Sequence, residues 1–137
     1  MIQVSSPVFS GNEVAYVTAC VQSGIVSSHS DFVKKFEGIF ADKFGMSAVS
    51  CTSGTAALHL AAMALGLSAK DRVLVPSMTF AATASAARIA GAEVVFLDVD
   101  PGTGLLDLGS LERILEGEDG KKASAIIPVH LNGQCVD

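Results

Sequence analysis

Residues 48–76, "AVSCTSGTAALHLAAMALGLSAKDRVLVP", contain the pattern from which the fold class is predicted. "AVSCT" (48–52) and "RVLVP" (72–76) are short apolar runs typical of buried strands. Between them, residues 54–65 form a longer alanine-rich run that stops at Gly66, which predicts a buried helix. A strand, a helix and a strand in this order predict a βαβ unit with parallel strands.

The same alternation continues to the last residue. We expect a helix over 80–90, a strand over 93–99, a helix over 108–115, a solvated loop over 116–122 and a strand over 124–130. The sequence therefore predicts an α/β fold with a mostly parallel sheet and helices on both faces.

Two helices are predicted before this region. Ser10-x-x-Glu13 has the spacing of a capping box, and the helix that follows is expected to end at Gly24. An aromatic stripe over 32–44 predicts a second helix, closed by Gly45, with its phenylalanines in a core. We expect a helical segment over 1–45 and a partial α/β domain over 46–137.

Composition excludes several classes of protein. The net charge is −5 and the nine lysines and arginines are scattered, which disfavours nucleic-acid binding. The charge-poor stretch 49–69 is interrupted by polar residues, so a membrane span is not expected, and the N-terminus lacks a signal-peptide pattern. A cytoplasmic location is the resulting expectation. An odd number of cysteines without a CxxC pair, at 20, 51 and 135, predicts buried, reduced thiols.

Ser53-Gly54-Thr55 stands where the first strand meets its helix. The first amides of a helix have no internal partner and carry the positive end of its dipole, so this point suits an anion such as a phosphate. The motif is neither GxGxxG, a Walker loop nor a GxSxG elbow. Ordinary capping of a buried helix is the alternative.

Other polar side chains have mainly structural interpretations. Asp98 and Asp100 precede Pro101 and Gly102, which favours a turn over a metal site. His59 is expected in the core and His29 in an exposed loop. His130 and Gln134 follow the last strand, where either a hydrogen-bonded structural role or a role in a site is possible.

Four segments, "SGTAALHLA", "VLVPSMTFAATASA", "GAEVVFLDVD" and "IIPVHLNGQ", occur in this order. Together they resemble the DegT/StrS-type sugar aminotransferases, which depend on pyridoxal 5'-phosphate (PLP) and have the type I aspartate-aminotransferase fold. Within that family, perosamine-synthase-like enzymes are the most similar. The resemblance covers essentially all 137 residues and corresponds to the first third or so of a family member, the N-terminal part of its large domain.

The resemblance implies roles for particular residues. Ser53, Gly54, Thr55 and Ala56 would hold the cofactor phosphate, and Phe80 would stack on the pyridine ring; a core position is the alternative for Phe80. The Schiff-base lysine and the aspartate that pairs with the pyridine nitrogen would lie beyond residue 137. The chain alone is therefore expected to be inactive, with no catalytic residue of its own. Ser30 departs from the glycine common in the family.

The implied function is transfer of an amino group, from glutamate, to a nucleotide-linked keto-sugar in amino-sugar and polysaccharide biosynthesis. The expected partners are that substrate, the amino donor, and either further copies of the chain or the missing C-terminal portion. A non-catalytic remnant, or an interaction or phosphate-binding module that kept part of the fold, is the alternative.

Overall fold

The structure is a computed structural model and describes residues 5–137. The chain divides into two compact units, one that ends at Ser50 and one that comprises Cys51–Asp137. The predicted domains, 1–45 and 46–137, remain a prediction.

The described residues of the first unit, 5–50, contain the helices α1 (Glu13–Ser23) and α2 (Asp31–Phe44). Glycines with left-handed backbone, Gly24 and Gly45, end them as predicted. Helix α2 begins at Ser30, whose Oγ accepts a hydrogen bond from the Phe32 amide at 3.3 Å. The predicted capping box is wrong. Helix α1 begins after Asn12, whose side chain makes no capping hydrogen bond, and the Glu13 carboxylate instead accepts from the Gly11 amide.

The aromatic stripe of α2 forms but is not buried. Phe36, Phe40 and Phe44 follow one another at intervals of one helical turn. The ring centroids of Phe36 and Phe40 are 4.7 Å apart, and those of Phe40 and Phe44 are 6.0 Å apart. Each of the three side chains is more than 40% exposed. The predicted core position is therefore wrong for this chain, because no element of the described first unit covers that face. Tyr16 of α1 meets α2 at Phe32 and Lys35.

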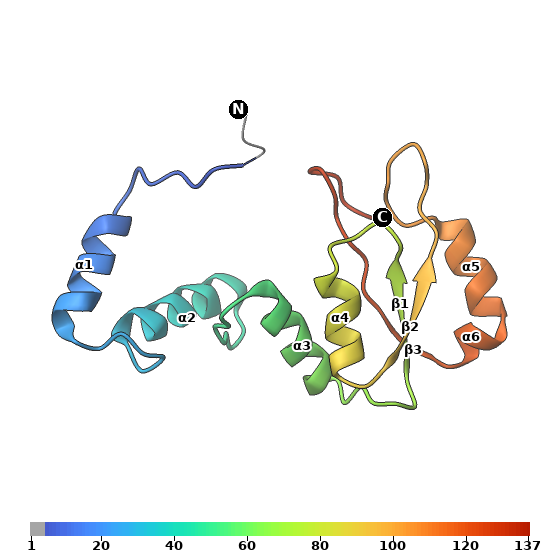
Figure 1. The fold of residues 1–137 in the computed structure, drawn as a ribbon, viewed down its shortest axis with the longest axis horizontal. Helices are drawn as coiled ribbons and strands as arrows, with labels where there is room; N and C mark the ends of the chain where they lie inside the picture. Colours follow the sequence, from blue (N-terminus) through green and yellow to red (C-terminus); the bar gives the residue numbers. More distant parts are fainter. Residues whose placement is uncertain (1–4) are drawn as a thin grey trace. The chain divides into compact units, whose positions relative to one another are not determined.

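The second unit is built around a parallel sheet (Figure 1). Its elements are α3 (Gly54–Ala64), β1 (Arg72–Pro76), α4 (Ala82–Ile89), β2 (Glu93–Leu97), α5 (Leu108–Glu116), α6 (Glu118–Lys121) and β3 (Ala123–Ile126). The strand order is β2-β1-β3, so β1 is central. The predicted α/β class and the parallel strands are confirmed.

Helices cover both faces of the sheet, and β1 contributes to both cores. Val73 and Val75 are fully buried against Ala87 of α4. Leu74 faces the other way, with Leu97 and Leu106, against α5. This alternation follows from the two-residue period of a strand, and a strand buried on both faces reads as a continuous apolar run.

Several predicted elements differ from the structure. Residues 48–52 do not form a strand, because no other strand within residues 5–137 lies beside them to complete their backbone hydrogen bonds. The Ser50 amide and hydroxyl donate instead to Glu37 Oε1, each at 2.8 Å. The predicted loop 116–122 contains the short helix α6, and β2 and β3 end earlier than predicted. Helix α3 forms as predicted, yet Ala62 is its one buried residue.

The cysteines are less buried than predicted: Cys20 is half-buried, while Cys51 and Cys135 are exposed. Cys51 and Cys135 both lie in irregular segments, outside the helices and strands. Among residues 5–137, no helix combines the length and the apolar character needed to cross a membrane.

Candidate functional site

The candidate site lies at the carboxyl end of β1. In open α/β sheets this is the edge where ligands bind. The strand arrows in Figure 1 point toward the end of the unit at which α4 begins. Helix α3 leads into the amino end of β1 and packs beside α4. The Ser53–Ala56 segment therefore stands at the start of α3, and Phe80 stands just before α4, in two helices that pack against each other.

The start of α3 is partly capped by its own sequence. Ser53 has extended backbone angles, and its Oγ accepts a hydrogen bond from the Ala56 amide at 3.2 Å. The Ser53 carbonyl accepts from the Ala57 amide at 3.0 Å. The Gly54 and Thr55 amides belong to the first turn, where no carbonyl of the helix can reach them. Capping and anion binding are therefore compatible here, because each uses different amides.

Gly54 stands in open space. A Cβ atom built at this position would meet nothing within 4 Å, and its backbone is not in the left-handed region. Neither packing within the chain nor backbone conformation requires glycine here. The chain therefore leaves the Cβ side of Gly54 open, and the absence of a side chain there lets an anionic group such as a phosphate approach the helix start closely.

Phe80 lies between β1 and α4 and is 80% exposed. The alternative core position is therefore wrong for Phe80 in this chain. Its carbonyl accepts from the Thr83 amide at 3.0 Å, and the hydroxyls of Thr79 and Thr83 are 2.8 Å apart. These contacts hold the backbone at the start of α4, while the ring remains free to contact a flat partner.

His130 and Gln134 follow β3, and both are exposed. His130 Nδ1 accepts a hydrogen bond from the Val136 amide at 3.0 Å, which is the structural role considered for it. Leu131 and Gln134 form a small antiparallel bridge. His59 is half-buried in α3 and His29 is exposed.

Asp100 organises a turn, as predicted. Its Oδ1 accepts from the Gly102 amide at 2.9 Å, and from the Thr103 amide at 2.8 Å and hydroxyl at 3.1 Å. These hydrogen bonds, those from Thr103 first, hold the pKa of Asp100 below its ordinary value. Within the described part of the chain, no group of three or more histidine, cysteine or acidic side chains could hold a metal ion.

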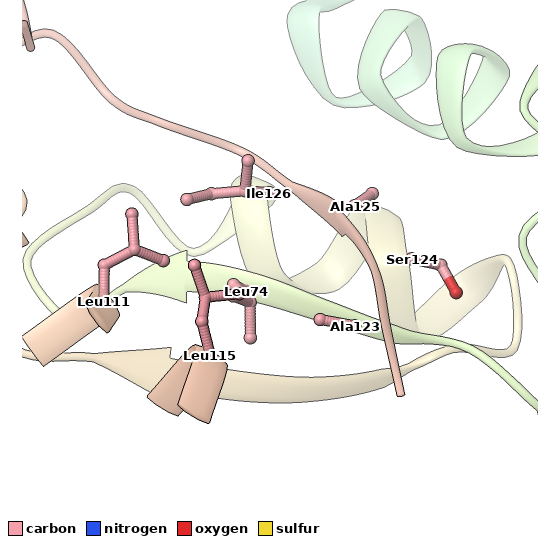
Figure 2. A pocket seen from close by; sticks show the side chains of 7 residues that line it. All are labelled: Leu74, Leu111, Leu115, Ala123, Ser124, Ala125 and Ile126. Atoms are coloured by element: carbon pink, nitrogen blue, oxygen red, sulfur yellow. The ribbon is translucent and has the colours of Figure 1, made fainter. Parts of the chain in front are cut away.

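An apolar pocket of ≈ 270 Å³ lies between α5 and β3, lined in part by Leu74, Leu111, Leu115 and Ile126 (Figure 2). The sequence analysis missed it, because it exists only where β3 is placed beside β1 and α5 leaves part of the sheet uncovered. Its lining is almost entirely hydrocarbon, so it offers contact surface and no catalytic group.

Comparison with known proteins identifies the protein family to which this chain belongs. Residues 8–137 match the DegT/DnrJ/EryC1/StrS aminotransferase family. The chain belongs to this family, and the predicted family is confirmed.

The relatives indicate which members are similar. The chain is 42% identical to the GDP-perosamine synthase of Caulobacter vibrioides, over 99% of this chain and 36% of the relative. It is 37% identical to the UDP-2-acetamido-2-deoxy-3-oxo-D-glucuronate aminotransferase of Pseudomonas aeruginosa, over 92% of this chain and 36% of the relative. The chain thus spans about a third of the length of the curated relatives that it matches.

Solved structures agree with the fold. A DegT DnrJ EryC1 StrS aminotransferase from Brucella abortus matches with a TM-score of 0.79 and 33% identity, over 90% of this chain and 34% of that one. The PLP form of Spr1654 from Streptococcus pneumoniae matches with a TM-score of 0.86 and 30% identity, over 99% and 34%. The chain therefore has part of an aminotransferase fold.

Proposed function

We propose that this chain supplies the phosphate-binding part, and one face of the ring-binding part, of a PLP-dependent sugar aminotransferase. The observation that carries the proposal is the start of α3, which is open on the Cβ side of Gly54, together with an 80% exposed Phe80 just before α4, the helix on which α3 packs. A doubly charged phosphate and a flat ring are the chemical groups that this pair of features suits.

Each residue has a separate task in this proposal. The Gly54 and Thr55 amides, with the positive end of the helix dipole, bind the phosphate oxygens. The Ser53 hydroxyl accepts a hydrogen bond from the Ala56 amide, and this contact fixes the helix start. Phe80 covers one face of the ring and excludes water from it. When bound, PLP supplies the electron sink that amino transfer requires.

The substrate follows from the relatives' names. They are a synthase of a GDP-linked amino sugar and an aminotransferase of a UDP-linked keto-sugar acid. We propose a nucleotide-linked keto-sugar as amino acceptor and glutamate as donor. We place no catalytic residue within residues 1–137: the proposed Schiff-base lysine and its partner aspartate belong to portions that the longer relatives carry, and turnover would need such a portion.

The proposal is tested at Gly54. Gly54→Val should lower the affinity of the chain for PLP more than its affinity for pyridoxal, because the added side chain stands where the phosphate would approach. Isothermal titration with both ligands measures the two affinities, and Gly38→Val, at an exposed glycine of α2, is the control. Equal losses for both ligands, or no PLP binding by the unsubstituted chain, would contradict the proposal.

A further inference from the structure

β3 carries one residue more than β1 opposite it. Arg72 pairs with Ala123, but Val73 pairs with Ala125 and Leu74 with Ile126. The backbone hydrogen bonds agree: the Arg72 amide donates to the Lys122 carbonyl at 3.2 Å, and the Ile127 amide donates to the Leu74 carbonyl at 2.9 Å. Ser124 is therefore a bulged residue, left without a partner on β1.

The bulge changes which face each later residue occupies. In a regular strand, residues 123, 125 and 127 would lie on one face. Here Ala123 packs with the cluster of Leu74 and Leu97, whereas Ala125 and Ile127 pack with the opposite cluster, around Val73. Figure 2 shows Ile126 on the pocket side with Leu111, and the Ser124 hydroxyl at the far end from Leu111.

Hydrophobicity alone specifies this register weakly. The run "ASAII" (123–127) is apolar at four of its five positions, so a strand without the bulge would still place apolar side chains on both faces. It would bring Ser124 opposite Val73 and Ala125 opposite Leu74. Only the Ser124 hydroxyl, turned toward the sheet core, would clearly disfavour that alternative.

Asp71 supplies a contact that depends on the bulge. Its Oδ1 accepts from the Ser124 hydroxyl at 2.6 Å. Its Oδ2 accepts from both the amide and the hydroxyl of Ser68, each at 2.8 Å, so the carboxylate is fixed from the turn before β1. The neighbouring Arg72 pairs with Glu93 and Asp119 at this same end of the sheet, but those contacts do not involve Ser124.

We propose that Asp71 is a register lock, which selects the bulged pairing of β3 by holding Ser124 outside the ladder. The register that this hydrogen bond selects also sets the position of the residues that follow β3. A slip of one residue moves the segment after β3 by about 3.3 Å and exchanges the faces of Ile126 and Ile127. The inference uses the sheet alone and does not depend on the proposed cofactor.

Amide hydrogen exchange of the 137-residue chain, followed by NMR, distinguishes the two registers. In the bulged register the Ile127 amide is bonded to Leu74 and exchanges slowly, while the Ile126 amide points away from β1. In the slipped register the Ile126 amide would bond to Leu74 and exchange slowly, and the Ile127 amide would point away from β1. Asp71→Ala should therefore lower protection at Ile127 at least tenfold and raise it at Ile126.

Three further variants complete the test. Asp71→Asn keeps an acceptor oxygen for the Ser124 hydroxyl and should retain slow exchange at Ile127. Asp119→Ala removes an ion pair at the same end of the sheet and should also retain it. Ser124→Ala changes one exposed residue, removes the locking bond, and should show the same exchange of roles even if Asp71→Ala does not fold. Protection that stays at Ile127 in Ser124→Ala would overturn the proposal.

Discussion

Replacing Phe80 with alanine separates a role in ligand binding from a role in packing. The side chain is 80% exposed, so its removal takes little apolar surface out of the core. Exposed substitutions of this kind change the free energy of unfolding by about 0.5 kcal/mol or less. Truncation of a buried phenylalanine would instead cost about 3–5 kcal/mol. The structure predicts the small value.

Binding should respond differently. If the Phe80 ring lies against the PLP ring, its loss removes apolar contact and aromatic stacking together worth roughly 1–3 kcal/mol. That corresponds to an increase in Kd of about 5- to 160-fold. Urea unfolding followed by circular dichroism measures stability, and a fluorescence titration with PLP measures affinity. Phe44→Ala, at a 58% exposed phenylalanine of the other unit, is the matched control.

Two results would refute this reasoning. A loss of 3 kcal/mol or more in unfolding free energy for Phe80→Ala would mean that the ring is packed in the folded chain. An unchanged Kd for PLP, with a normal unfolding curve, would mean that Phe80 does not contact the cofactor.

Three further predictions follow from the same structure. The purified chain with PLP, glutamate and a nucleotide-linked keto-sugar should form no amino sugar by mass spectrometry; stoichiometric product would contradict our placement of the catalytic lysine. The folded-state pKa of Asp100 is lowered, so its stabilising contribution is present above the ordinary value of 3.8 and is lost as pH falls through the folded pKa. Asp100→Asn should therefore flatten the acid side of the urea-midpoint profile, and an unchanged slope would count against this. The exposed face of α2 should make the chain self-associate in analytical ultracentrifugation, and Phe40→Ser should reduce the association; a monomer at high concentration would argue otherwise.

Local signals in the sequence determined much of the fold. "RVLVP" (72–76) predicted β1 with its observed bounds, because a strand buried on both faces needs a continuous apolar run. Gly24 and Gly45 marked helix ends, since each adopts a left-handed backbone that glycine adopts without steric cost. The start of α3 at Gly54 was likewise predicted from its alanine-rich run, and Ser53 caps that helix with its short side chain.

Features that need a contact with a residue from elsewhere in the chain became visible only in the folded structure. Residues 48–52 have the composition of a strand, but a strand exists only where a neighbour completes its hydrogen bonds. The phenylalanines of α2 have the spacing of a core, but burial requires something to cover them. The bulge at Ser124 could not be foreseen, because Asp71 meets Ser124 across 53 positions of the sequence and local periodicity carries no information about such a contact.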